Sequence, residues 1–122
     1  MRLQLDLDIG SQAARPGATV AGSVLVLEGG GTRSLTASLE FHEHSTSGGN
    51  KVVTSISTGP LHEGELAAGT RFPFTLVLPG DALPSYRSEN GELYWEVHVR
   101  SDELGVDTHV RKRVLVGVVR DA

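Results

Sequence analysis

Apolar and polar residues alternate along most of this chain, and a period of two is typical of half-buried β-strands. The alternation is clearest at residues 2–9, 35–42, 72–78 and 93–100. Successive side chains of a strand point to opposite faces, so each segment turns an apolar face toward a core and a polar face toward water. No segment carries the apolar stripe of an amphipathic helix, and the pattern therefore predicts an all-β chain.

Two further segments are apolar on both faces. In residues 20–28 two valines point to one side and two leucines to the other, and residues 114–119 are rich in valine. A strand of this kind is central in its sheet or covered on its outer side. The cover that we expect is a second lobe missing from this chain, or a second copy of the chain.

Turn-forming residues separate the strands at intervals of roughly 8–12 residues, which is the spacing of a β-sandwich or barrel. A polar loop at 45–50 joins the third strand to a hairpin partner at 52–57, and a weaker strand is expected at 61–66. Residues 79–91 form a long irregular connection with two prolines. We therefore expect seven or more antiparallel strands in a single domain that spans residues 1–122.

The composition narrows the class of protein. A chain of 122 residues can bury a core without disulfides or metal. With aromatic residues at only 5%, that core must consist mainly of leucine, valine and isoleucine. The absence of cysteine excludes disulfides, zinc–thiolate sites and thiol nucleophiles. A formal charge of −4 argues against nucleic-acid binding, which needs a basic surface.

The sequence also bears on location. No apolar run approaches the roughly 20 residues of a membrane-spanning helix. The first residues alternate instead of forming the apolar block of a signal peptide. We therefore expect no transmembrane segment and a cytoplasmic protein.

Two stretches of sequence carry a family resemblance. Residues 15–24 read RPGATVAGSV, and residues 72–79 read FPFTLVLP. The sequence LPSY follows at 83–86, and a strand with one tryptophan follows at 93–97. In this order and spacing they resemble the N-terminal lobe of arrestin-like proteins, and the bacterial sporulation-control branch in particular. The resemblance implies an immunoglobulin-like β-sandwich and a non-catalytic role as a protein–protein interaction module, an adaptor or scaffold.

The length of the chain departs from that family. Arrestin-like proteins usually have two lobes, whereas this chain has the length of one. The charged core that joins the two lobes therefore cannot be assigned to any residue here. The resemblance implies either one lobe of a longer protein or a one-lobe member that forms a homo-oligomer, and it leaves the protein partner open.

The resemblance also implies partners that bind at strand edges and loops. Tyr86 and Arg87 lie in the connection 79–91, which a rigid sandwich holds out from its end. Tyr94 occupies a polar-face position of its strand, where an aromatic ring is available to a ligand. We expect these residues to contact a protein partner, and the two tyrosines are also the aromatic residues available to a carbohydrate.

Arg111, Lys112 and Arg113 form the one basic cluster of the sequence. Alternation places Arg111 and Arg113 on one face and Lys112 on the other, beside two valines. An inward-pointing lysine is a device that protects a free sheet edge. Alternatively, the arginines contact an anionic partner or a membrane surface.

The histidines suggest a second functional class. His42 and His44 are two residues apart and share the outer face of their strand with Glu40. In an immunoglobulin-like sandwich, His98 lies on the outer face of the neighbouring strand. Three imidazoles on adjacent strands can hold zinc or copper, with Glu40 or water as the fourth ligand. The alternatives are therefore a metal-binding sandwich and a merely solvated polar face.

Other chemistry finds little support in the sequence. There is no G-x-S-x-G motif of a serine hydrolase. Residues 29–31 lack the Lys-Ser/Thr of a phosphate loop, so we interpret them as a hairpin turn. Asp102, Glu103 and Asp107 lack the spacing of a calcium loop and are interpreted as a polar turn. We expect that the protein is not an enzyme and needs no cofactor.

Overall fold

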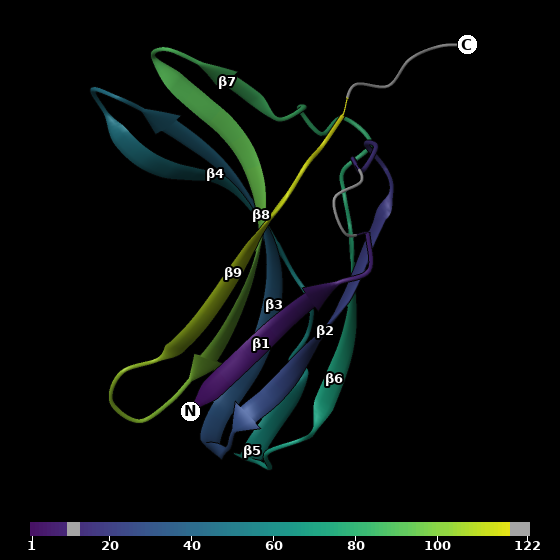
Figure 1. Cartoon of the computed structure of the whole chain (residues 1–122), viewed down its shortest axis with the longest axis vertical. Coiled ribbons are helices and arrows are strands. Elements are labelled where there is room, and N and C mark those ends of the chain that lie inside the picture. The colour runs from purple at the N-terminus through teal and green to yellow at the C-terminus, as the bar shows by residue number, and fades with distance from the viewer. Residues whose placement is uncertain (10–12, 118–122) are drawn as a thin grey trace.

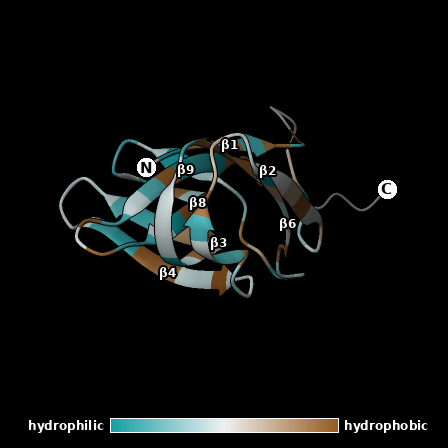
Figure 2. Cartoon of the chain, turned by 90° about the horizontal axis from the view of Figure 1, so that it is seen from below, coloured by the Kyte–Doolittle hydropathy of each residue, from teal (hydrophilic) through white to brown (hydrophobic). Residues whose placement is uncertain are grey.

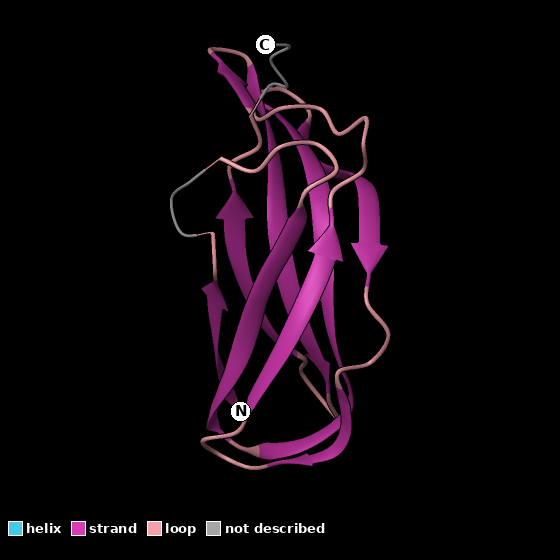
Figure 3. Cartoon of the chain, turned by 90° about the vertical axis from the view of Figure 1, so that its right-hand side faces the viewer, coloured by secondary structure: helices cyan, strands magenta, loops and turns pink. Residues whose placement is uncertain are grey.

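The computed structural model describes residues 1–9 and 13–117, and these contain strands and loops only (Figure 3). All strand pairs are antiparallel. The predicted all-β sandwich is therefore confirmed, with nine strands in the described residues: β1 (Arg2–Leu7), β2 (Thr19–Glu28), β3 (Gly30–Ser45), β4 (Gly49–Ser57), β5 (His62–Leu66), β6 (Arg71–Val77), β7 (Tyr86–Ser88), β8 (Gly91–Asp102) and β9 (Thr108–Val114).

The strands form a small sheet and a large sheet (Figure 1). The small sheet has the order β1-β2-β6. In the large sheet, β3 and β8 are paired along most of their length. The outer edge of β3 carries β5 and then β4, and the outer edge of β8 carries β9 and then β7. As a result β4 and β7 lie at one end of the large sheet and β5 at the other.

The core fills the space between the two sheets. It is built from alternate residues of each strand, so the strands are banded by hydropathy along their length (Figure 2). Val24, Leu39 and Val97 are completely buried. Trp95 is 2% exposed and donates a hydrogen bond from Nε1 to the carbonyl oxygen of Leu83 over 2.8 Å. This bond fastens the connection after β6 to the inner face of β8.

The small sheet accounts for three features of the sequence. The apolar segment 20–28 is β2, which is central in the small sheet. Pro73 lies in β6, an edge strand of the same sheet, where its missing N–H leaves no ladder bond unmade. Gly22 lies between β1 and β6, and a Cβ there would stand 2.5 Å from the carbonyl oxygen of Asp6. Only glycine permits this close approach.

Other expectations need correction. The irregular connection 79–91 contains the short strand β7, which pairs with β8. The glycines at 29–31 form no isolated hairpin turn, because β3 already begins at Gly30 and pairs with β5. The last strand ends at Val114, and the chain then makes a parallel bridge between Val116 and Ala14. The end of the expected valine-rich segment, residues 118–119, lies outside the described residues.

Candidate functional site

The outer face of the large sheet, turned away from the small sheet, carries a row of charged and aromatic side chains. The register places Glu40 of β3 beside Glu96 of β8, and Glu96 beside Arg113 of β9. One step along the sheet, His98 lies beside Arg111. Side chains on one face of neighbouring strands are close enough to interact. The row therefore brings acids, bases and histidines from three strands together.

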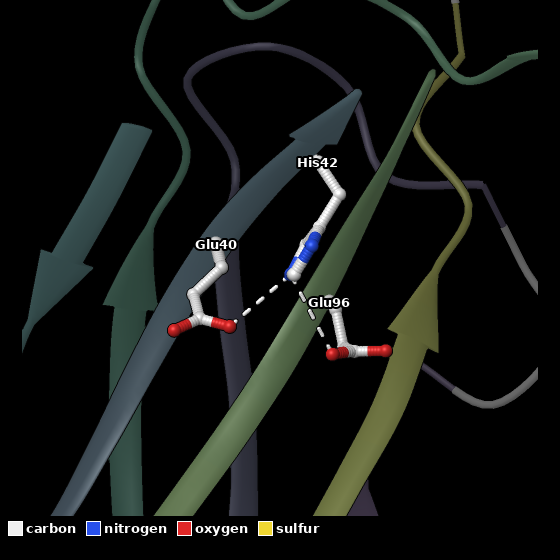
Figure 4. A group of neighbouring side chains, drawn as sticks. All are labelled: Glu40, His42 and Glu96. Carbon is white, nitrogen blue, oxygen red and sulfur yellow. Dashed lines mark hydrogen bonds and ion pairs between the residues drawn. The ribbon is translucent and has the colours of Figure 1, made fainter. Parts of the chain in front are cut away.

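Arg111 is held between the two glutamates. Its Nη1 donates to Oε1 of Glu40 and to Oε1 of Glu96, each over 3.0 Å. The ring of His42 projects between the same two carboxylates, with Nε2 3.1 Å from Oε1 of Glu40 and 3.6 Å from Oε1 of Glu96 (Figure 4). The Glu40 and Glu96 side chains are 13% and 12% exposed, so the two carboxylates are largely desolvated, whereas Arg111 is 44% exposed.

The charges in this cluster support one another. Burial raises the pKa of Glu40, but the hydrogen bonds from His98 and His42 and the charge of Arg111 outweigh it and hold the pKa below its ordinary value. Burial lowers the pKa of Arg111. The hydrogen bonds and charges of Glu96 and Glu40 outweigh this effect, so the pKa of Arg111 lies above its ordinary value. Both side chains therefore remain charged near neutral pH.

The three atoms Glu40 Oε1, His42 Nε2 and Glu96 Oε1 are close enough together to hold a metal ion. Arg111 Nη1 lies 3.0 Å from both carboxylate oxygens, so the guanidinium already supplies a cation to this position. The cluster is best described as an ion-paired network that joins β3, β8 and β9.

Next to this network lies an aromatic stack. The rings of His42 and Tyr94 are parallel within 2°, with centroids 4.8 Å apart. The guanidinium of Arg113 lies 3.8 Å from the centroid of the Tyr94 ring, and Asn50 donates to the Tyr94 hydroxyl over 3.3 Å. Tyr94 is 9% exposed, so the ring is fixed rather than free. The expectation of an available aromatic face at Tyr94 is therefore wrong, because the residue is buried and His42 and Arg113 lie against its ring.

A groove opens where the edge of β8 changes partner. Leu93 is the last residue of β8 that pairs with β7, and Trp95 is the first that pairs with β9. Among the described strands, Tyr94 between them pairs with His42 of β3 alone. The groove has a volume of about 380 Å³. Its walls are formed by Ser85, Tyr86, Arg87, Glu92, Leu93, Tyr94, Arg113, Val114 and Leu115.

The groove gathers four of the five residues that the sequence singled out for binding, Tyr86, Arg87, Tyr94 and Arg113. The fifth, Arg111, lies in the ion-paired network instead. Sequence reasoning missed Glu92, whose Oε2 accepts a hydrogen bond from Arg113 over 2.8 Å. It also missed Leu115, which is 55% exposed. Neither residue stands out in the sequence, since only the pairing of β8 with both β7 and β9 brings Glu92 and Leu115 to the groove.

The predicted histidine triad is only partly brought together. Imidazole nitrogens of His42 and His98 both contact the Glu40 carboxylate, at 3.1 and 3.2 Å. His44 is exposed and lies opposite Glu92, one strand position beyond the His42–Tyr94 pair on the same face. A β-bulge between Phe41 and His42 interrupts the regular register at this point.

The remaining charged motifs lie in β9 and in the turn before it. Lys112 lies on the opposite face from Arg111 and Arg113, across from Val97, and is exposed. In the β8–β9 turn, Asp107 accepts hydrogen bonds from the Glu103 N–H over 3.1 Å and from Arg100 over 2.8 Å. The carboxylates of this turn are thus used to shape it, in agreement with the polar-turn interpretation.

Comparisons with known proteins place the fold. No family model matches the sequence, and no curated protein matches it. A solved structure does match: the crystal structure of Spo0M, a sporulation control protein from Bacillus subtilis, with a TM-score of 0.66 and 19% sequence identity. The match covers 94% of this chain and 48% of Spo0M. The predicted arrestin-like fold is confirmed. The chain spans about half the length of Spo0M, and a likeness at this level of identity establishes the fold alone.

Among the described residues, no helix is long and apolar enough to cross a membrane.

Proposed function

We propose that this chain is a non-catalytic protein-binding module and that the groove between β7 and β9 is its docking surface. The observation that carries the proposal is the change of partner along β8 at Tyr94, which leaves a groove of about 380 Å³ on the sheet edge. Binding grooves of this kind accept an extended peptide segment, because backbone groups and alternate side chains of the peptide meet a strand edge.

The side chains around the groove are suited to protein contacts. Tyr86 is 61% exposed and Leu115 is 55% exposed, so both offer apolar surface. Arg87 and Arg113 flank Glu92 and leave one positive charge in excess. Tyrosine and arginine are the residues that most often dominate the binding energy of an interface. The groove therefore favours a peptide with an apolar residue followed or preceded by an acidic one.

The experiment is a selection from a random peptide library displayed on phage, with the folded chain as bait. Enriched peptides are synthesised, and their affinity is measured for the wild type, Y86A, R87A and the control L104A. Leu104 is 92% exposed and belongs to the turn after β8, not to the groove wall. We expect the groove variants to weaken binding by about tenfold or more, as interface anchors do, and the control to bind like wild type.

Equal affinity of all four proteins, or no enrichment above a heat-unfolded bait, contradicts the proposal. If the enriched peptides bind L104A more weakly but bind Y86A like wild type, the docking surface lies at the opposite end of the sheet.

A second candidate function is self-association through β4. This strand is a free edge of the large sheet, and all its residues except Ile56 are exposed. Val52 and Val53 are 47% and 48% exposed, and Lys51 is the one charged residue in the strand. A long, nearly uncharged edge rich in β-branched residues is a template for pairing with a second copy of the same strand.

Light scattering after gel filtration tests this second candidate. We expect a dimer that V53K converts to a monomer, whereas L104K at the far end of the sheet leaves it dimeric. A monomer at micromolar concentration in the wild type removes the support for self-association.

A further inference from the structure

His98 and His109 lie on neighbouring strands, β8 and β9, and meet through their ring nitrogens. His98 Nε2 is 2.7 Å from His109 Nδ1. The ring planes differ by 18° and the centroids are 5.0 Å apart. With the nitrogens in contact, such a wide centroid separation means that the rings meet edge to edge and nearly in one plane. Each nitrogen is therefore directed at the other ring.

Glu40 fixes the proton on His98. Its Oε2 lies 3.2 Å from His98 Nδ1, and a carboxylate can only accept a hydrogen bond. His98 therefore donates from Nδ1, and its Nε2 has a lone pair that points at His109. The His98 and Glu40 side chains are 11% and 13% exposed, so this orientation is held inside the sheet face. A carboxylate behind an imidazole is the arrangement that orients histidine ligands of metals.

The ring of His42 is oriented differently from that of His98. It donates from Nε2 to Glu40, and within the described part of the chain its Nδ1 is buried without a hydrogen-bond partner. A metal on Nε2 moves the remaining proton to Nδ1, where no acceptor meets it. A buried donor without a partner is costly. Arg111 Nη1 also lies 3.0 Å from both carboxylates beside this ring. His42 is therefore unsuited to bind metal.

We infer that His98 Nε2 and His109 Nδ1 form a binding site for a divalent metal ion that prefers imidazole nitrogen, Cu²⁺ above Zn²⁺. The preference follows the general order of affinity of nitrogen sites for divalent metals. Glu40 is the orienting carboxylate and not a ligand. The inference does not depend on the groove at Tyr94, which is lined by other residues.

The exposed ring makes room for the ion. Two nitrogens in neighbouring positions of a tetragonal Cu²⁺ ion are about 2.8–3.0 Å apart, given metal–nitrogen bonds of about 2.0–2.1 Å. The present separation is 2.7 Å. His109 is exposed, so its side chain can pivot outward while His98 stays in place. The proton of His109 Nδ1 moves to its Nε2, and no proton is lost from the pair. Water completes the coordination.

The experiment is a titration of the folded chain with Cu²⁺, followed by isothermal calorimetry and by electron paramagnetic resonance. The variants are H109A, H98A and the control H44A, which removes an exposed histidine that has no part in the pair. We expect one equivalent of Cu²⁺ with nitrogen hyperfine splitting from two imidazoles in the wild type and in H44A. H109A and H98A lose this signal. Circular dichroism confirms that each variant is folded.

A second variant tests the orienting role of Glu40. E40Q keeps both histidines and weakens Cu²⁺ binding by about 10–100-fold, the range found when such second partners are removed. Cu²⁺ uptake that is the same in H109A and wild type, or that is lost in H44A, overturns the inference. So does a wild-type chain that takes up no Cu²⁺.

Discussion

Arg111 Nη1 lies 3.0 Å from Glu96 Oε1, and this contact joins the edge strand β9 to β8 across the outer face of the large sheet. The same nitrogen also contacts Glu40 of β3. Without the guanidinium, two carboxylates that are 13% and 12% exposed face each other with His42 between them. A desolvated charge that loses its partner destabilises the folded state.

We therefore expect R111A to lower the free energy of unfolding by about 1–3 kcal/mol, the cost of leaving a buried polar group without its hydrogen-bond partner. Urea unfolding followed by tryptophan fluorescence measures it. R111K is the matched control, since it keeps the charge and loses the bidentate reach, and it should recover part of the difference. If R111A is as stable as wild type, the network contributes nothing to the fold.

Gly22 provides a test of packing inside the small sheet. A Cβ at this position would lie 2.5 Å from the Asp6 carbonyl oxygen and 2.9 Å from Cζ of Phe74. The backbone atom cannot move without opening the β1–β2 pair. We expect G22A to destabilise the chain by about 1–3 kcal/mol, the usual cost of overpacking. G80A is the control, because nothing lies within 4 Å of a Cβ there. Thermal unfolding compares the two, and equal midpoints would contradict this account.

Asp107 makes the stability of the β8–β9 turn depend on pH. The hydrogen bond from the Glu103 N–H and that from Arg100 hold the pKa of Asp107 below its ordinary value of 3.8. A group whose folded pKa is lowered stabilises the protein above the unfolded pKa, and this contribution is lost as pH falls through the folded pKa. We expect D107N to be less stable than wild type at neutral pH.

The difference between D107N and wild type should shrink as the pH drops below 3.8, because the wild-type carboxyl then becomes protonated too. Urea midpoints measured across the acid range give this comparison. D81N serves as a control outside the turn. A D107N deficit that stays constant with pH means that the carboxylate charge is not what holds the turn.

Much of the fold was predictable because apolar and polar residues alternate with a period of two in a half-buried strand. The pattern at 93–100 correctly predicts that Trp95 and Val97 face the core. β7 was not predictable, since it has three residues, all exposed, and therefore no apolar pattern. The start of β3 at Gly30 was missed for a related reason, because glycine indicates a turn in a sequence even where it lies in a strand.

The residues of the candidate site were also predictable in part, whereas their arrangement in space was not. Tyr86 and Arg113 were identified from residue type and loop position, which are local properties. Their meeting in one groove depends on β7 and β9 sharing an edge of β8, and strand order is not encoded in periodicity. The pairing of His98 with His109 was missed because it also needs the β8–β9 register, in which these residues are diagonal neighbours.

Trp95 couples the core to the groove. Its Nε1 donates to the Leu83 carbonyl, and two residues later the N–H of Ser85 donates to the Val116 carbonyl beside the groove wall. W95F keeps an aromatic ring but leaves the Leu83 carbonyl without its hydrogen-bond partner, so we expect it to destabilise the chain by about 1–3 kcal/mol. Because the connection 79–85 then moves more freely, W95F should also weaken binding of a groove peptide.

F74L is the control, since Phe74 is a core residue of the small sheet away from the groove. It should lower stability without changing peptide affinity, as measured by fluorescence polarisation of a labelled peptide. If both variants lose affinity equally, the groove responds to overall stability and not to the Trp95–Leu83 bond.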